Sequence, residues 1–411
     1  MLFLKNIYNS QFKDNNAFIL ENDELVSYNE LTKKIEDFSK NIKKRSLIFL
    51  LCKNNFESIV GYLGSIRSNC AISLIDEKIS DESFIKLIDN YHPDFIFFDK
   101  KRLKKLDNFS ISYTFKSFEL LEAKKKVEKK LNDNLALLIS TSGSTGTSKL
   151  VRQSVDNLKH NTNSIIQYLD ISQKDISITT LPMSYVYGLS IINTHLNQGA
   201  TITLNSKSVI EKEFWNKIQK NRVTNFGGVP YTYSILEKIK LKNFDLSSLK
   251  YTTQAGGKIN KQTARNVLKD YNSLGIKLYI MYGAAEATAR MSYLPWKNIE
   301  KIHSIGKAIP GGEFYLEDSD RKVINEINTH GELIYKGKNV CMGYAENFQD
   351  LIKGDENKGK LKTGDVAYKD KNNFYYVVGR KDRYIKIFGM RINLQELEDI
   401  ISNFGIENIC M

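Results

Sequence analysis

Leu138-Ile-Ser-Thr-Ser-Gly-Ser-Thr-Gly-Thr-Ser-Lys-Leu-Val151 is the stretch of sequence that says most about the fold. The apolar run 135–139 leads into it and predicts a buried strand, after which hydroxyl residues, two glycines and a lysine follow at once. Gly143 and Gly146 can adopt backbone angles that other residues avoid, which lets successive N–H groups converge on an anion. The hydroxyls add hydrogen-bond donors and Lys149 adds a positive charge, so the stretch predicts a phosphate-binding loop.

The spacing of this loop excludes one class of phosphate-binding protein. A Walker-type loop needs a glycine, four residues and then Gly-Lys-Ser/Thr. Here Gly143, Gly146 and Lys149 follow one another at intervals of three residues, so the chain is not a P-loop NTPase. A solvated turn between a strand and a helix is the alternative that the loop alone leaves open.

Length and composition describe an ordinary globular protein. The chain has 411 residues, of which 41% are hydrophobic and 26% charged, and this length predicts about two or three domains. The net charge of +13 is dispersed, apart from short basic clusters at 100–105 and 124–130. We interpret these clusters as solvated faces and expect no nucleic-acid partner, although the excess of positive charge would attract a polyanionic ligand.

The cysteines and histidines indicate neither a disulfide framework nor a metal centre. Cys52, Cys70, Cys341 and Cys410 are far apart, and the histidines share no metal-ligand spacing. Since no apolar run is long enough for a signal peptide or a membrane span, we expect a soluble cytoplasmic protein.

A serine hydrolase is excluded because no Gly-x-Ser-x-Gly elbow occurs.

Strands that alternate with helices predict the fold class. Ser27-Tyr-Asn-Glu30 is a capping-box pattern, and apolar residues at helical spacing follow to about residue 43. Buried strands are predicted at 47–52, 71–75, 95–98 and 135–139, and residues 100–130 read as a polar connection. Helices are then predicted at 156–169, 185–195, 210–221 and 233–239, between strands at 176–181, 200–204, 225–229, 249–254 and 277–281. This alternation is typical of doubly wound, largely parallel sheets.

Three predicted strand ends carry residues suited to a ligand, and ligands of open α/β sheets collect at such ends. The loop is the first. The second is Ala255-Gly256-Gly257, where absent side chains would let a flat ring approach the backbone. The third runs from Met281 to Glu286, where Tyr282 could stack on a base and Glu286 could hold Mg²⁺. Taken alone, the glycines would be a tight turn and Glu286 a surface residue.

Two further residues fit a ribose. Asp365 follows a glycine, and its carboxylate could accept two hydrogen bonds from a vicinal diol. Arg380 follows Gly379 and supplies a donor fork. Taken alone, Asp365 would be a turn residue and Arg380 a surface charge.

Together these motifs resemble those of the adenylate-forming superfamily, which contains acyl-CoA synthetases, adenylation domains and luciferases. The loop 141–149 is similar to its phosphate loop. The later motifs agree in order: Leu181-Pro-Met-Ser-Tyr-Val-Tyr-Gly188, Val229-Pro230, Ala255-Gly-Gly257, Tyr282-Gly-Ala-Ala-Glu286, Thr363-Gly-Asp365 and Gly379-Arg-Lys-Asp-Arg-Tyr-Ile-Lys386. The resemblance runs from Tyr28 to about Glu398.

The resemblance implies ATP-dependent activation of a small carboxylic acid to an acyl-adenylate, with release of pyrophosphate. The acceptor would be CoA or the phosphopantetheine thiol of a carrier protein, and the cofactors would be ATP and Mg²⁺. Lys149 and Glu286 would be catalytic, with Glu286 as the metal ligand. The ATP site would comprise Thr141, Ser142, Gly143, Ser144, Thr145, Gly146, Lys149, Gly256, Met281, Tyr282, Asp365 and Arg380. The acyl pocket would be bordered by Tyr185, Tyr187, Gly188, Val229 and Gly257.

The resemblance also implies the domain organisation. Residues 1–381 would form a large N-terminal AMP-binding domain. It would consist of two doubly wound α/β subdomains, at about 1–160 and 161–300, and a small antiparallel β subdomain at 301–381. Asp382 would be the hinge, and residues 382–411 would begin a C-terminal lid. Relatives carry a lysine near their C-terminus that has no counterpart before Met411, so we expect a truncated lid.

Departures from the superfamily pattern leave two alternatives open. The usual threonine before the metal-binding glutamate is Ala285, and Tyr185 stands where many relatives have histidine. Val186 replaces an aspartate of amino-acid-activating modules, which argues against an α-amino acid. The alternatives are a catalytically degenerate nucleotide-binding protein and an adenylation enzyme that loads a carrier protein.

Overall fold

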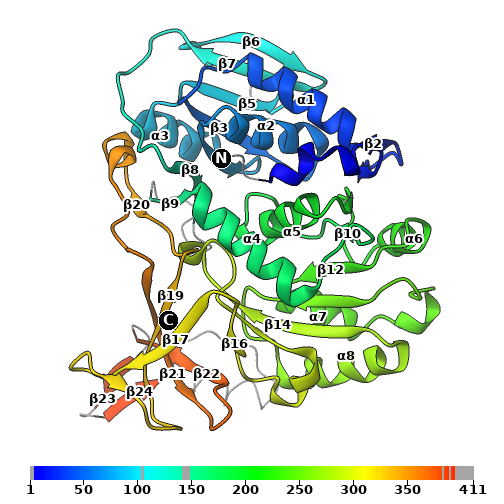
Figure 1. Ribbon diagram of the computed structural model, residues 1–411, viewed down its shortest axis with the longest axis vertical. Coiled ribbons are helices and arrows are strands. Elements are labelled where there is room, and N and C mark those ends of the chain that lie inside the picture. Colours follow the sequence, from blue (N-terminus) through cyan, green and yellow to red (C-terminus); the bar gives the residue numbers. More distant parts are fainter. Residues whose placement is uncertain (1–3, 103–105, 141–148, 382–383, 388–389, 394–411) are drawn as a thin grey trace.

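Two large sheets and a smaller antiparallel sheet build the described part of the protein (Figure 1). The structure is a computed structural model that describes residues 4–102, 106–140, 149–381, 384–387 and 390–393. Residues 141–148 of the glycine loop, Asp382 and the rest of the predicted lid beyond 393 lie outside these residues. The predicted α/β class is confirmed, and none of the helices within the described ranges is long and apolar enough to cross a membrane.

The first sheet has eight strands in the order β20-β9-β8-β4-β3-β5-β7-β6. They are β3 (Leu47–Cys52), β4 (Ala71–Asp76), β5 (Phe95–Asp99), β6 (Phe109–Phe115), β7 (Phe118–Ala123), β8 (Leu135–Ile139), β9 (Leu150–Ser154) and β20 (Gly343–Ala345). Strands β5, β3, β4 and β8 run parallel, and β7 and β9 add antiparallel neighbours. Its helices are α1 (Tyr28–Lys40), α2 (Phe56–Arg67) and α3 (Asp81–Tyr91).

The second sheet has nine strands in the order β16-β15-β14-β13-β12-β10-β11-β1-β2. They are β1 (Asn16–Ile19), β2 (Leu25–Ser27), β10 (Ile176–Ile178), β11 (Thr201–Thr203), β12 (Asn225–Gly228), β13 (Tyr251–Gln254), β14 (Lys277–Tyr282), β15 (Ser292–Leu294) and β16 (Lys307–Ala308). Its helices are α4 (Val155–Leu169), α5 (Val186–Asn197), α6 (Lys212–Lys220), α7 (Pro230–Leu236) and α8 (Lys261–Leu274). Figure 1 shows α4 and α5 between the two large sheets.

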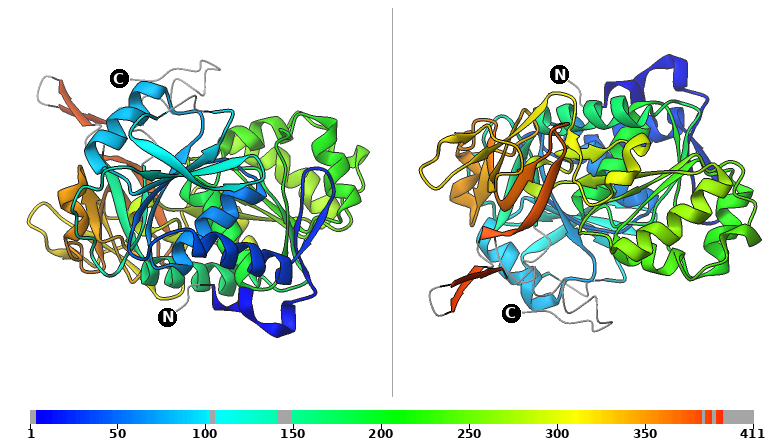
Figure 2. Two further views of the ribbon diagram at one scale, coloured as in Figure 1. Left: turned by 90° about the horizontal axis from the view of Figure 1, so that it is seen from above. Right: turned by 90° about the horizontal axis from the view of Figure 1, so that it is seen from below.

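The third sheet lies to one side of the other two in both views of Figure 2. Its order is β18-β17-β19-β21-β22. The strands are β17 (Gly312–Glu317), β18 (Val323–Ile324), β19 (Gly331–Gly337), β21 (Lys360–Lys369) and β22 (Tyr375–Arg380), and a separate hairpin pairs β23 (Tyr384–Ile387) with β24 (Met390–Asn393).

Local sequence explains most of these elements. The Ser27–Glu30 capping box is present at the start of α1, where it satisfies N–H groups that have no partner inside the helix. Strands β3 and β8 are buried along their whole length, as expected for apolar runs covered on both faces. One core cluster joins Leu50 of β3, Leu158 of α4 and Ile192 of α5, so the two large sheets pack around shared helices.

Two predictions for the first sheet were wrong. Residues 100–130 do not form a plain connection, because they contain the antiparallel pair β6–β7 at the sheet edge. The strand β9 directly after the glycine loop was also missed. Each large sheet takes strands from beyond its predicted range, since β1 and β2 join the second and β20 joins the first. The domain boundaries therefore stay a prediction.

Candidate functional site

The carboxyl ends of β12, β13 and β14 lie side by side, because these strands are neighbours and run parallel. Val229, Gly256 and Tyr282 stand at these ends. A Cβ atom on Gly256 would lie 2.7 Å from Tyr185 Oη and 3.2 Å from Val229 Cγ1, and Gly256 has a φ of +84° that favours glycine. The structure thus brings together Tyr185, Val229 and Gly256, which come from three separate motifs.

Three of the predicted acyl-pocket residues, Tyr185, Tyr187 and Val229, take part in one largely apolar cluster. Its buried members are Leu181, Tyr187, Ile191, Ala255 and Met281, and Tyr168, Tyr185, Val229 and Tyr293 pack against them. The Tyr187 hydroxyl donates to the Thr253 carbonyl of β13 at 2.7 Å, which fixes the ring beneath that strand. Met281, predicted to contact adenine, has its side chain in this cluster.

Gly188 and Gly257 of the predicted pocket each lie close to a neighbouring proline residue, but in different ways. A Cβ atom on Gly188 would lie 2.2 Å from the Pro182 carbonyl oxygen, so glycine is needed for the close packing of α5 on residues 181–182. Gly257 lies beside Pro230, 3.1 Å from the position of an added Cβ. Their place at an acyl pocket stays a prediction.

Tyr282, Asp365 and Arg380 meet where the end of β14 faces the third sheet. The Tyr282 hydroxyl donates to Asp365 Oδ2, and Arg380 Nη1 lies 3.6 Å from Asp365 Oδ1. Asp365 and Arg380 are paired across β21 and β22, whereas Tyr282 is 83 residues from Asp365 in the sequence. Burial, and secondly the Asp365 carboxylate, raise the pKa of Tyr282 well above its ordinary value, so its hydroxyl stays a donor.

Lys149 and Glu286 both contact an aromatic residue that the sequence analysis did not single out. The ammonium of Lys149 is 4.0 Å from the ring centroid of Tyr344, and the Tyr344 hydroxyl donates to Glu286 Oε1 at 2.7 Å. Tyr344 reaches this position because β20 pairs with β9, the strand that begins directly after Lys149. The two predicted catalytic residues are therefore joined through Tyr344.

The segment around Glu286 is fixed from two directions. Gln153 Nε2 donates to the Ala285 carbonyl at 2.8 Å, and the Cys341 amide donates to the Glu286 carbonyl at 2.8 Å. Gln153 is fully buried, so loss of the hydrogen bond from its side-chain amide would be costly. Strand β9 and the segment just before β20 thus set the position of the backbone at Ala285 and Glu286.

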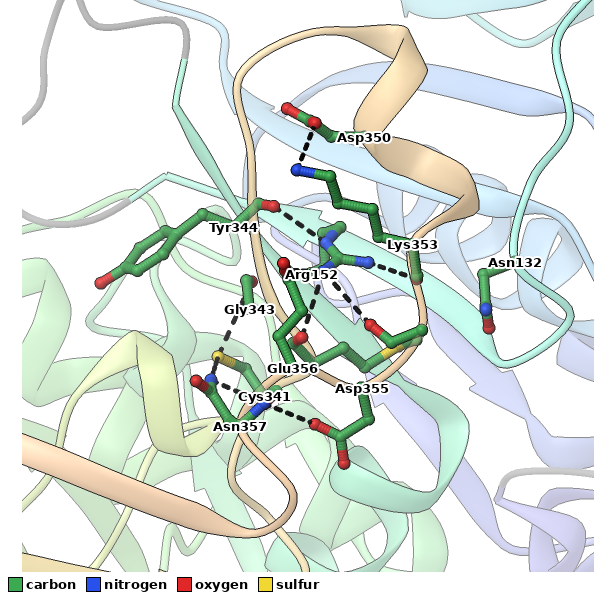
Figure 3. Close-up of polar contacts among 12 residues, drawn as sticks. Asn132, Arg152, Cys341, Gly343, Tyr344, Asp350, Lys353, Asp355, Glu356 and Asn357 are labelled. Carbon is green, nitrogen blue, oxygen red and sulfur yellow. Dashed lines mark hydrogen bonds and ion pairs between the residues drawn. The ribbon is translucent and has the colours of Figure 1, made fainter.

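Arg152 fixes the chain that carries Tyr344 (Figure 3). Its side chain is fully buried in β9. The guanidinium donates to the backbone carbonyls of Met342, Tyr344, Lys353 and Gly354 and to the carboxylate of Glu356. Figure 3 shows the Tyr344 ring pointing away from this network, which places its hydroxyl on the Glu286 side.

Tyr344→Phe is expected to weaken the binding of MgATP about tenfold, because it removes a hydrogen bond to a charged group that orients Glu286. The ring beneath Lys149 remains, so binding of ATP without Mg²⁺ should change little. Calorimetric titration with ATP in the presence and absence of Mg²⁺ measures both values. Tyr231→Phe, at an exposed tyrosine, is the matched control. A loss that is equal with and without Mg²⁺ would contradict this role of Tyr344.

Sequence reasoning missed three residues of this region: Arg152, Arg290 and Tyr344. Tyr344 falls in the predicted β subdomain, but no local pattern indicates that it meets a carboxylate 58 residues away. No sequence pattern sets the two arginines apart from the other charged residues, and the structure shows both side chains buried. The loop residues Thr141 to Gly146 and the hinge Asp382 lie outside the described residues, so their roles stay predictions.

Comparison with known proteins identifies the family. The family model "AMP-binding enzyme" matches residues 8–345. The chain therefore belongs to this family, and the resemblance to adenylate-forming enzymes is confirmed.

Curated relatives have modest sequence identity to this chain. Luciferin 4-monooxygenase of Luciola mingrelica is 27% identical over 66% of this chain and 50% of its own length. 2-Succinylbenzoate–CoA ligase of Bacillus pumilus is 29% identical over 67% of this chain and 55% of its own. The chain thus spans little more than half the length of these relatives.

Solved structures share the fold. The O-succinylbenzoate coenzyme A synthetase MenE of Bacillus subtilis, in complex with ATP and magnesium, superposes with a TM-score of 0.79 at 21% identity, covering 98% of this chain and 84% of MenE. ATP-bound MatB of Rhodopseudomonas palustris gives 0.80 at 18% identity, covering 98% and 83%.

Proposed function

We propose that the protein activates a small carboxylic acid with ATP, forming an acyl-adenylate and pyrophosphate, and then passes the acyl group to a thiol. In the first step a carboxylate oxygen bonds to the α-phosphorus as the bond to the bridging oxygen breaks and pyrophosphate leaves. In the second step the thiol sulfur bonds to the acyl carbon and AMP leaves. Both steps depend mainly on positioning and on stabilising charge.

One observation carries the nucleotide part of this proposal. The Tyr282 hydroxyl donates to Asp365, which joins the end of β14 to the third sheet and brings Arg380 into the same cluster. An aromatic ring beside a carboxylate and a guanidinium suits a nucleoside, because the ring stacks on the base and the carboxylate accepts from the ribose hydroxyls.

The residues around Glu286 fit a magnesium ion. Glu286 is partly exposed, and within the described residues no lysine or arginine forms an ion pair with it. No group of three or more acidic, histidine or cysteine side chains suited to a metal occurs in the described part, which agrees with Mg²⁺ held by one carboxylate together with substrate phosphates. When bound, the ion would neutralise phosphate charge, and Lys149 would add to this.

Acid-dependent exchange of labelled pyrophosphate into ATP tests the first step. We expect exchange with at least one acid of a panel of aliphatic, aromatic and dicarboxylic acids, and none without acid. If MgATP binds but no acid in the panel supports exchange, the proposed activity is wrong.

The acceptor thiol is CoA or the phosphopantetheine of a carrier protein. Several curated relatives are named as CoA ligases, and this supports CoA as the first acceptor to test. Supplying CoA to the adenylate-forming reaction and following acyl-CoA by mass spectrometry distinguishes it from a phosphopantetheinylated carrier domain.

A catalytically degenerate nucleotide-binding protein is the second candidate, and Ala285 favours it. The superfamily's usual hydroxyl is missing at this position, and Ala285 is buried in the main core cluster. In an active enzyme, Ala285→Thr is expected to raise the rate of adenylate formation about tenfold, because a hydroxyl could then donate to the charged reaction centre.

Ala285→Val is the matched control for this change, since valine has the shape of threonine without the hydroxyl. The rate of pyrophosphate exchange should rise for threonine only. An equal response of both variants would show that packing, and not the missing hydroxyl, determines the rate.

A further inference from the structure

Arg290 is a buried cation whose neighbours are all neutral. Its side chain is 1% exposed. Arg290 Nη2 donates to Ser190 Oγ at 3.0 Å, and Nη1 donates to Tyr168 Oη at 3.3 Å and to the sulfur of Met281. The Nε atom is buried and has no hydrogen-bond partner in the described structure. Among the described residues, no carboxylate forms an ion pair with this guanidinium.

The tyrosines around Arg290 do not supply the missing negative charge. Burial raises the pKa of Tyr168 and of Tyr185, and raises that of Tyr187 to about 12, although Arg290 acts in the opposite direction on all three. These hydroxyls are therefore neutral at physiological pH. A buried charge without a counter-charge is expensive, so an anion is the expected partner of Arg290.

Arg152, the other buried arginine described above, has a full set of structural partners and serves as a comparison for Arg290. The Arg152 side chain is also fully buried, but it bonds to four backbone carbonyls and to the carboxylate of Glu356. Arg290 has no such carboxylate, and one of its acceptors is a thioether, which is a weak acceptor. The donors of Arg290 are thus only partly satisfied by the protein.

Arg290 lies against the predicted acyl pocket. Its guanidinium is 4.3 Å from the ring centroid of Tyr187, and Tyr168 and Met281, which it contacts, belong to the same cluster as Tyr185 and Val229. Tyr168, Tyr185 and Tyr293 at the border of this cluster are partly exposed, so the cluster reaches the protein surface along these tyrosines.

We propose that Arg290 binds a second carboxylate on the acyl substrate, so that the substrate class is dicarboxylic acids. This inference rests on the proposed function. One carboxylate of the acid would react at the nucleotide, and the other would replace the weak Met281 acceptor and take the Nε–H of Arg290. Ser190 and Tyr168 add hydroxyls beside the fork, and a guanidinium with hydroxyl donors is a donor set suited to a carboxylate.

Binding of matched acids tests the inference without requiring turnover. Succinate, glutarate and adipate are titrated into the protein with AMP by calorimetry, beside their monoamides, which keep the length but lose one charge. We expect at least one dicarboxylate to bind about 30-fold or more tightly than its monoamide, and Arg290→Met to abolish this preference. Arg265→Met, an exposed arginine of α8, should leave it unchanged.

Arg290→Lys guards against a variant that fails to fold, because it keeps the charge but not the fork, and should retain an intermediate preference. Equal binding of acid and monoamide, a preference that survives Arg290→Met in a folded protein, or no binding of any dicarboxylate would overturn the inference. Pyrophosphate exchange then separates the two proposals. Arg290-dependent binding without exchange would support a carboxylate site at Arg290 and refute the proposed activity. Exchange with monocarboxylates that is unaffected by Arg290→Met would support the activity and refute the inference.

Discussion

Glu286→Gln is expected to lower acid-dependent pyrophosphate exchange by about 10²- to 10³-fold, the usual result of removing one group that stabilises transition-state charge. The change is nearly isosteric, and the amide oxygen can still accept from the Tyr344 hydroxyl. Only the negative charge is lost, and with it the preferred hard ligand for Mg²⁺. Steady-state exchange rates at several Mg²⁺ concentrations measure the effect, and high Mg²⁺ should restore part of the rate.

Glu313→Gln is the matched control, because Glu313 is an exposed residue of β17 in the third sheet. It removes the same charge from the protein without changing the site, and its exchange rate should equal that of the unchanged protein. If Glu286→Gln keeps both its rate and its Mg²⁺ dependence, Glu286 does not hold the metal.

Arg152→Met is expected to destabilise the protein by about 3–5 kcal/mol, the cost of removing one partner from a buried charged network. Four backbone carbonyls of residues 342–354 would lose their donor. Glu356 would lose its ion pair but is half-exposed, so water can solvate it. Hydrogen exchange followed by mass spectrometry should show faster exchange across 342–356, together with a lower melting temperature.

The consequence for function distinguishes this network from ordinary core packing. Since Arg152 positions the strand of Tyr344, the variant should also bind MgATP more weakly, whereas Arg222→Met at an exposed arginine should change neither property. A melting temperature within a degree or so of the unchanged protein would refute the stabilising role of Arg152.

Much of the fold follows from local sequence. The Ser27–Glu30 box and the continuous apolar runs of β3, β4 and β8 are predictable because each depends on residues that are neighbours in the chain. The missed strand β6, Phe109-Ser-Ile-Ser-Tyr-Thr-Phe115, alternates apolar and polar residues as a strand does, so the sequence carried a signal for it although most of the strand is exposed. Strand β9 carries buried Arg152 and Gln153, whose partners are supplied by distant backbone carbonyls.

Some residues of the candidate site were likewise predictable from the sequence, and others were not. Motif order predicts that Gly256, Tyr282 and Glu286 share one site, since strand ends of a parallel sheet meet at one edge. Asp365 lies in the antiparallel third sheet, and only the resemblance to the superfamily assigns it to the same site. Tyr344 and Arg290 could not be found like this, because their roles depend on a carboxylate 58 residues away and on a hydroxyl 100 residues away. Only packing shows that Tyr344 contacts the Glu286 carboxylate and that Arg290 has no carboxylate partner among the described residues.

Transfer of oxygen from the acid to AMP tests the central proposal most directly. An acid that supports exchange is labelled with ¹⁸O in its carboxylate, and the reaction is run with MgATP and a thiol. If a carboxylate oxygen attacks the α-phosphorus, each AMP released by the thiol carries one ¹⁸O atom, which mass spectrometry detects. Unlabelled AMP, or label in phosphate or pyrophosphate, would contradict an acyl-adenylate.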